Sequence, residues 1–308
     1  MTTRAGIVST TDVVRQSLMG RRRDWKGILF EGVLLFMLLL SLLILITLLS
    51  QVVSGGLGVL TEDGSQFLGN GISSLPERAG VMQGLVGSAL MMVFVLVVAF
   101  PIGIGAAVYL EEYAPNTRVT RFLAVNIRNL AGVPSVVYGL LGLAIFVELL
   151  ARNTGGRSVI SGGLTLAILA LPIVIITASE AIRAVPDSIR EAGFGVGATR
   201  WEVVRSHVLP SAAPGILTGC VLSISRALGE TAPLLLVGAT TGFLATGGVY
   251  EQLYSPFTSL PTIVFAWAKE PDPGFRDLTA AAIIVLLLLI LTANAAAIVL
   301  RNRYERKW

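Results

Sequence analysis

The chain has 308 residues, of which 54% are hydrophobic and only 14% are charged. A soluble domain contains about 25% charged residues, so this composition excludes an ordinary soluble protein. The formal net charge of +4 could suggest a nucleic-acid-binding protein, but the positions of the basic residues along the chain favour a membrane protein and no nucleic acid partner.

Long apolar windows are the main signal along the chain. The hydrocarbon core of a bilayer requires about 20 apolar residues per helix, and six windows meet this requirement: residues 32–53, 81–110, 129–147, 158–179, 212–238 and 278–300. We therefore predict an all-α, polytopic membrane protein with about six transmembrane helices. A cleaved signal peptide is the alternative for the first window. Its apolar stretch is longer than the usual 7–15 residues, so we expect a retained helix.

The basic residues indicate the topology. If both termini lie on one side, that side receives sixteen of the 23 Lys and Arg residues and the other side receives five. This asymmetry predicts that both termini are cytoplasmic, including residues 1–27 and the basic tail 302–308. The other two, Arg128 and Arg226, lie within or at the edge of apolar windows. We expect Arg128 to reach toward the cytoplasmic interface.

The segments between the windows define the domain organisation. Residues 28–80 contain the first helix and an external loop that is rich in Gly and Ser, and residues 81–301 form the main transmembrane domain. Four prolines interrupt residues 241–277. We expect an outer loop with short helical pieces there, because such a segment is too broken to span the membrane.

A polar stretch, EAGFGVGATRWEVVRSHVLP (residues 191–210), follows the fourth window. Pro186 suits the first position of a short helix, and Gly195 or Gly197 can close it. Thr199 and Glu202 have the spacing of a capping box, which predicts a second helix.

The second short helix has a predicted apolar face and a predicted end. Trp201, Val204 and Val208 follow one another at spacings of three and four, which places them on one side of a helix. Pro210 is expected to end this helix. Two short helices joined by a glycine turn favour a docking element over a plain connecting loop.

The same stretch resembles the cytoplasmic motif of permease subunits in ATP-binding-cassette (ABC) importers. That motif reads Glu-Ala-Ala, three residues, Gly, nine residues, Ile, one residue, Leu-Pro. The matching residues are Glu191, Ala192, Gly197, Leu209 and Pro210, whereas Gly193 and His207 replace the second alanine and the isoleucine. The resemblance implies a type I importer permease fold. It also implies that a coupling loop (residues 180–214) inserts into a separate ATPase through Glu191, Ala192, Gly193 and Gly197.

The two departures from the motif lead to separate expectations. Gly193 is expected to loosen the first short helix by about 1 kcal/mol. His207 is either a pH sensor or a solvated or hydrogen-bonded bystander.

The chain contains no G-x-x-x-x-G-K-[ST] phosphate loop, so ATP hydrolysis is expected on a partner subunit. We expect no cofactor or metal, and no enzymatic activity in this chain.

A second motif, SRALGETAPLL (residues 225–235), resembles the fifth-helix signature of phosphate-importer permeases. Its Thr-Ala-Pro ending is similar to the PstA family and not to the paralogous PstC family. The likeness extends over residues 81–238. It implies a permease subunit in the cell membrane that assembles with a PstC-like permease, with cytoplasmic PstB-like ATP-binding subunits (two copies), and with an extracytoplasmic phosphate-binding protein.

Arg226 and Glu230 are the candidate residues of the substrate path. Their spacing of four places them on one helix face, and charges inside a membrane usually face a cavity or a partner. Gly215, Gly219 and Ser223 form a small-residue stripe that allows a neighbouring helix to approach, so the pair is expected to point into the bundle. A guanidinium suits phosphate. Glu230 would hold Arg226 in an empty path or accept a hydrogen bond from protonated phosphate. The alternative is an ion pair that only fastens helices together.

Four other functions remain as alternatives. The chain could be a permease for another oxyanion such as sulfate or molybdate, or the paralogous PstC partner. A membrane-embedded enzyme is disfavoured because the sequence offers no catalytic constellation of carboxylates, Ser/His or metal ligands. A channel or sensor would require no ATPase partner.

Overall fold

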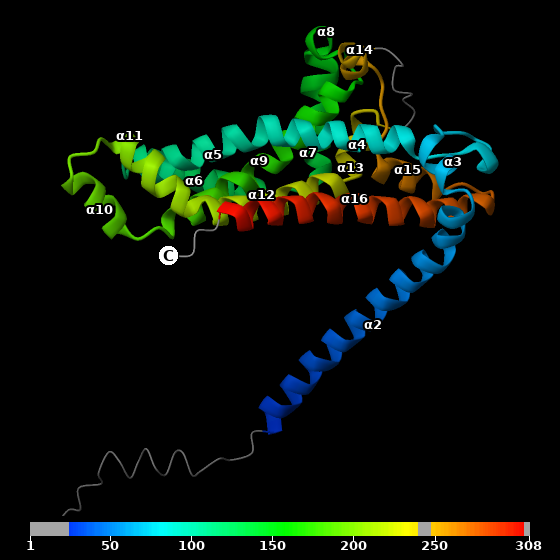
Figure 1. Cartoon of the computed structure of the whole chain (residues 1–308), viewed down its shortest axis with the longest axis horizontal. Helices are drawn as coiled ribbons and strands as arrows, with labels where there is room; N and C mark the ends of the chain where they lie inside the picture. Colours follow the sequence, from blue (N-terminus) through cyan, green and yellow to red (C-terminus); the bar gives the residue numbers. More distant parts are fainter. Residues whose placement is uncertain (1–24, 240–247, 305–308) are drawn as a thin grey trace, which may run out of the picture. The chain divides into compact units, whose positions relative to one another are not determined.

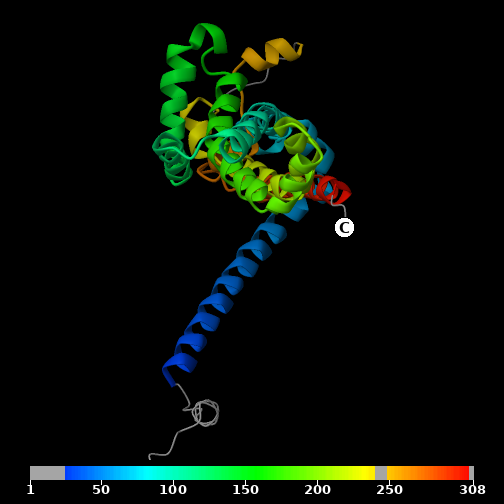
Figure 2. The same cartoon turned by 90° about the vertical axis from the view of Figure 1, so that its left-hand side faces the viewer.

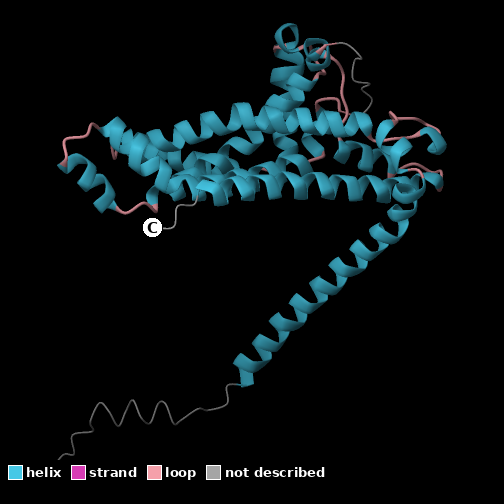
Figure 3. Cartoon of the chain, in the orientation of Figure 1, coloured by secondary structure: helices cyan, strands magenta, loops and turns pink. Residues whose placement is uncertain are grey.

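The computed structural model describes residues 25–239 and 248–304. Within these ranges the chain forms helices joined by turns and contains no strand (Figure 3), so the predicted all-α class is confirmed. The chain divides into two units, Met1–Gln51 and Val52–Trp308. In the first unit, residues 25–51 are helical and exposed throughout. An exposed apolar helix of this length suits the hydrocarbon core of a bilayer.

The first predicted helix extends further than expected. Helix α2 (Trp25–Glu62) continues through residues that we predicted as an external loop, and the short helices α3 (Gly64–Gly69) and η1 (Pro76–Arg78) follow it. Gly55 and Gly56 serve packing within the second unit. A Cβ on Gly56 would lie 2.6 Å from the backbone nitrogen of Ala281 in α16 (Gly274–Tyr304). A glycine is therefore required for close helix contact, and it does not mark a loop.

Four long helical segments form the bundle of the second unit. The first runs through α4 (Met82–Phe94), η2 (Val95–Ala99), α5 (Phe100–Val108) and η3 (Tyr109–Tyr113). The others are α9 (Val159–Arg183), α16, and α11 (Arg200–Val203) continuing through η5 (Val204–Val208) into α12 (Leu209–Gly229). Helix α9 contacts α4, α5 and α12, and the segments run side by side in Figure 1 and are seen end-on in Figure 2.

The third predicted span, residues 129–147, is wrong as a single straight helix. Helix α6 (Arg118–Ala131) ends before Gly132, and a new helix of α7 (Ser135–Gly142) and η4 (Leu143–Leu149) leaves at 101°. Pro134 explains the break, because proline lacks an N–H donor and disfavours a helical conformation in the residue before it. Ser135–Leu149 turns away from the bundle axis toward α8 (Ala151–Thr154) and α14 (Val249–Tyr254) (Figure 2).

The number of spans agrees with the prediction. The described residues contain five helices that are long and apolar enough to cross a membrane, or six if the bent pair counts as one span. The predicted short helical pieces between the last two spans are confirmed as α14 and α15 (Leu260–Trp267). Residues 240–247, of which 241–247 belong to the same predicted loop, lie outside the described residues, as do 1–24 and 305–308.

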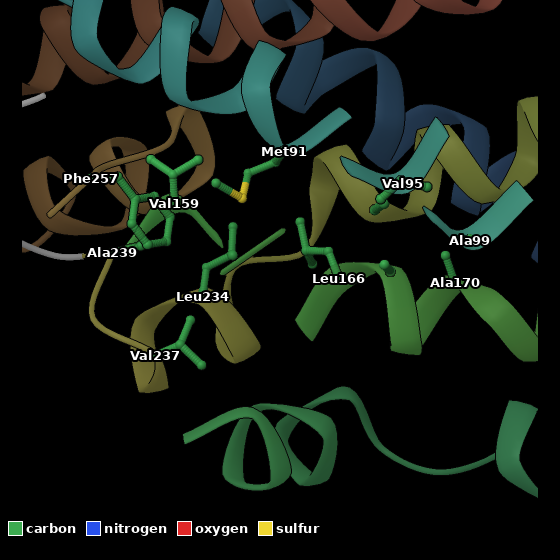
Figure 4. Close-up of a cluster of buried hydrophobic side chains, with 12 residues drawn as sticks. Met91, Val95, Ala99, Val159, Leu166, Ala170, Leu234, Val237, Ala239 and Phe257 are labelled. Atoms are coloured by element: carbon green, nitrogen blue, oxygen red, sulfur yellow. The ribbon is translucent and has the colours of Figure 1, made fainter. Parts of the chain in front are cut away.

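One hydrophobic cluster joins the bundle to the segments that leave it. The segment from α4 to η3 (Met82–Tyr113) is the second span. Its residues Met91 and Val95 pack against Leu166 of α9 and Leu234 of α13 (Ala232–Leu236), and Phe257 completes the cluster (Figure 4). All of these side chains are buried. The cluster therefore fixes the position of α13, which directly follows Glu230, relative to the bundle.

Candidate functional site

Two helix breaks lie next to each other inside the second unit. One is the break between α6 and α7 at residues 132–134, and the other separates α12 from α13 at Glu230 and Thr231. Helix α7 packs against α13, so the segments after the two breaks are in contact. Non-helical backbone at membrane depth is tolerated only where protein buries it or where it lines a water-filled cavity. This junction is therefore a candidate for a polar path.

The predicted Arg226–Glu230 pair is present at this junction. Arg226 Nε lies 3.3 Å from Glu230 Oε1. Arg226 belongs to the last turn of α12, where the helix dipole favours a cation. Glu230 lies beyond the helix in an extended conformation with φ −79° and ψ 121°, so the predicted fifth span (212–238) is wrong in its bounds and the carboxylate belongs to the break itself.

Tyr138 of α7 connects the two breaks. Its hydroxyl donates a hydrogen bond of 2.8 Å to the carbonyl of Leu130 near the end of α6. This carbonyl lies at the end of its helix and also accepts a hydrogen bond of 3.1 Å from the Val133 amide, so Tyr138 adds a second donor from α7. Arg226 also lies close enough to Tyr138 for the two side chains to interact electrostatically. The junction thus combines a cation, a carboxylate and a phenol.

The expectation that the charged pair points into the bundle does not hold for Arg226 in the single chain. The small-residue stripe does pack as expected, because Cβ atoms added to Gly215 and Gly219 would collide with Ala181 and Thr177 of α9. However, a spacing of four from Ser223 reaches the buried Ala227 and not Arg226. The Arg226 side chain is 45% exposed and that of Glu230 is 19% exposed. Arg226 is therefore accessible at the edge of the packed stripe.

Arg128 lies close to the first of the two helix breaks. It lies in the last turn of α6 and not at the start of a span. Together with Arg121 it lines a cleft between α6 and the end of α9, where Ser179 and Glu180 form the opposite wall.

The two predicted short helices of the coupling loop are present. The first is α10 (Asp187–Gly195), and Gly197 at its end adopts the left-handed φ of 83° that favours glycine. The capping box that begins α11 is confirmed. The Thr199 amide donates to Glu202 Oε2 at 2.7 Å, and the Glu202 amide donates to Thr199 Oγ1 at 3.4 Å.

Two details of the second short helix were wrong. Trp201 is 56% exposed and does not join the apolar face, which consists of Val203, Val204 and Val208. Pro210 does not end the helix, because α11 continues through η5 into α12 as far as Gly229. Proline is tolerated in the first turn of a helix, and the π-turn of η5 places Pro210 at that position of α12. The coupling loop therefore passes into the span without an interruption.

Gly193 has a packing role that differs from the expected one. It is buried, and a Cβ at this position would lie 2.7 Å from Cγ2 of Val203. Glycine here allows α10 to approach α11 closely, so the glycine that was expected to loosen the first helix is required where the two helices meet. His207 is exposed, as the solvated alternative requires.

The outer surface of the coupling loop combines acidic and apolar side chains. Glu191, Ala192 and Gly197 are exposed, and the neighbouring Phe194 and Val196 are exposed as well, as is Trp201. Exposed aromatic residues next to a charged residue are typical of a docking surface.

The inner side of the loop is held by arginine contacts to residues 111–113, which the sequence reasoning missed because the partners are distant in sequence.

Comparison with known proteins identifies relatives over most of the chain. Residues 99–307 match the family described as "Binding-protein-dependent transport system inner membrane component". The phosphate transport system permease protein PstA of Mycobacterium leprae is 35% identical over 249 residues, which cover 79% of this chain and 78% of that protein. The PstA protein of Xylella fastidiosa is 32% identical and covers 74% and 77%, respectively.

A third relative matches over a shorter segment of the chain. The probable ABC transporter permease protein YqgI of Bacillus subtilis is 35% identical over 199 residues, which cover 64% of this chain and 65% of that protein, just under two thirds of its length.

Solved structures with the same fold are also ABC transporters. A chain of a bacterial transporter for the acidic polysaccharide alginate superimposes with a TM-score of 0.63, at 16% identity, over 92% of this chain and all of that one. A chain of the MetNI methionine transporter in an inward-facing conformation gives 0.56, at 17% identity, over 76% of this chain. At such identities the likeness shows the fold alone, which is the predicted importer permease fold.

Proposed function

Because this chain belongs to the family of binding-protein-dependent transport system inner membrane components, we propose that it is the PstA-type permease subunit of an ATP-driven importer of inorganic phosphate. The observation that carries this proposal is the 32–35% identity to PstA proteins over about three quarters of the chain. The chain is a multi-pass membrane protein and belongs to a family of inner-membrane transport components. Its relatives are transport permeases and not enzymes.

The junction of the two helix breaks is proposed as part of the phosphate path. A guanidinium presents a planar fork of donors that matches phosphate oxygens, and Arg226 is accessible for such contacts. Its exposure on the single chain leaves room for a homologous PstC-like subunit to close the path from the other side. Glu230 then either releases Arg226 to the arriving anion or accepts a hydrogen bond from protonated phosphate, which sulfate cannot donate at neutral pH.

The coupling loop is proposed as the contact with the ATPase. Glu191, Ala192, Gly193 and Gly197 occupy the motif positions on its two short helices, and its exposed aromatic residues are candidate anchors for a groove. In this arrangement both termini and residues 180–214 face the cytoplasm and two PstB-like subunits. An extracytoplasmic phosphate-binding protein delivers substrate at the opposite side. ATP binding moves the coupling loop and thereby shifts the subunit pair between inward-open and outward-open states.

Uptake by the reconstituted complex tests this function. We expect ATP-dependent accumulation of labelled phosphate that excess sulfate or molybdate does not compete away, together with copurification of nucleotide-binding subunits. Competition by either oxyanion at similar concentration would assign the chain to the importer of that anion, and absence of an ATPase partner would favour a channel.

Substitutions at the pair test the path itself. Arg226→Ala and Glu230→Gln should leave the assembled complex intact and stop uptake. The matched control is Arg303→Ala, which removes an exposed arginine from the last turn of another span and should leave uptake unchanged. If both pair variants assemble and transport normally, the pair only fastens the helices.

A further inference from the structure

Three arginines that follow one another in the chain contact three consecutive side chains at the end of the second span. The pairs are Arg183 with Glu111, Arg190 with Glu112, and Arg200 with Tyr113. The acceptors all belong to η3, whereas the arginines come from α9, α10 and α11 in turn. The two helices of the coupling loop are therefore both attached to the same turn of the second span.

Arg190 makes the most extensive of these contacts. Its Nε and Nη2 donate to Glu112 Oε1 at 3.1 and 2.8 Å. Nη2 also donates to the Ile182 carbonyl at 3.0 Å, and Nη1 donates to the Val185 carbonyl at 2.7 Å and to Asp187 Oδ1 at 3.1 Å. A guanidinium has five N–H donors, so each of them has an acceptor. Arg190 thus connects the end of α9, the start of α10 and the end of the second span.

Burial distinguishes this pair from its neighbour. The side chains of Arg190 and Glu112 are 18% and 7% exposed, whereas Arg183 in the adjacent pair is 60% exposed and Glu111 is 17% exposed. Removing one partner of a buried pair leaves an uncompensated charge, which is strongly destabilising. An exposed pair contributes little because water screens it. The Arg183–Glu111 pair is bidentate, because Arg183 Nε and Nη2 donate to the two Glu111 oxygens at 3.2 and 2.7 Å, but its arginine lies largely in water. The Arg190–Glu112 pair is shielded from water on both sides and is therefore the less screened of the two.

We propose that the Arg190–Glu112 pair is the joint that makes the coupling loop and the cytoplasmic end of the second span move as one body. Only residues 184–186 separate α9 from α10. A short non-helical connection of this kind can act as a hinge that absorbs displacement of the coupling loop. Arg190 binds both sides of this connection as well as Glu112, so the displacement is transmitted to α9 and to the second span. Both residues are positioning residues, and this role rests on the proposed function.

The first test measures coupling in the whole complex. Proteoliposomes with the partner permease, the ATPase and the binding protein would report phosphate transported per ATP hydrolysed. Glu112→Gln keeps the side-chain shape without the charge, and Arg190→Lys keeps the charge with three donors. Both variants should retain ATP hydrolysis, and the ratio should fall about fivefold or more. The matched control Arg183→Lys should keep the wild-type ratio, and Glu112→Asp should partly restore it. Unchanged ratios in both joint variants would overturn the proposal.

The second test requires no partner and no transport. Hydrogen–deuterium exchange on the detergent-purified full-length chain should show faster exchange of the α10 amides in Glu112→Gln and Arg190→Lys, but not in Arg183→Lys. Equal exchange in wild type and both joint variants would overturn the joint, even if a variant did not assemble. A wild-type complex that does not transport phosphate would instead contradict the proposed function and leave this exchange result as the test of the joint.

Discussion

Replacing Gly193 with alanine tests how the coupling loop is packed. The importer motif carries alanine here, and alanine favours a helix over glycine by about 1 kcal/mol. The structure opposes this gain, because the new Cβ would lie 2.7 Å from Cγ2 of Val203. Valine has one preferred rotamer in a helix and cannot easily turn away, and overpacking of this kind costs about 1–3 kcal/mol. The net effect is a loss of about 0–2 kcal/mol of local stability.

Hydrogen exchange of the amides in α10 and η5 measures this difference. A loss of about 2 kcal/mol corresponds to exchange about thirty times faster. The matched control is Gly195→Ala in the same helix, where an added Cβ meets nothing within 4 Å; it should slow exchange by up to about fivefold. In a Val203→Ala background the clash is absent, so Gly193→Ala should then also slow exchange. If Gly193→Ala in the otherwise unchanged chain slows exchange as much as Gly195→Ala, the packing argument is refuted.

Two further predictions address helix packing and docking. Gly219→Leu should destabilise the chain by several kcal/mol in thermal unfolding, because the side chain would collide with Thr177 of α9. The control Gly105→Leu should be tolerated, because an added Cβ meets nothing within 4 Å at that position. Trp201→Ala should change stability by less than about 0.5 kcal/mol because the side chain is 56% exposed. It should nevertheless weaken binding of the ATPase subunits about tenfold or more, as measured by titration of the purified subunits; unchanged binding would remove Trp201 from the docking surface.

The bundle was predictable because a bilayer leaves few alternatives. Four of the six apolar windows became continuous helical segments, since an unpaired backbone in lipid is too costly. Two of the errors fall at prolines. Pro134 breaks a predicted span, whereas Pro210 was expected to end a helix and instead occupies the first turn of α12. Proline can break a helix or can occupy the first turn of one, and the conformation of the preceding turn decides which of the two occurs. That turn, η5, is a property of the folded chain that no local pattern indicated.

The site was predictable in its residues but not in its surroundings. The spacing of Arg226 and Glu230 indicated an ion pair, and the pair is present. Its exposure depends on which side of α12 the neighbour α9 covers, and hydropathy does not contain that information. The Arg190–Glu112 pair was beyond reach for a related reason. Its partners are 78 residues apart, and only the folded chain, in which the end of α9 contacts η3, brings them together.

The continuity of the helix from Arg200 to Gly229 links the two proposed sites directly. At about 1.5 Å per residue, Arg226 lies about 39 Å along this helix from Arg200. Had Pro210 ended the helix, a movement of the coupling loop could have been lost in a flexible connection. No break in the helix separates Arg200 from Gly229, so we expect displacement of its cytoplasmic end to be transmitted along α12 to Arg226 and the break at Glu230. In the proposed transporter the ATPase contact and the phosphate path therefore lie at the two ends of one helix, and the Arg190–Glu112 joint extends the same movement to the second span.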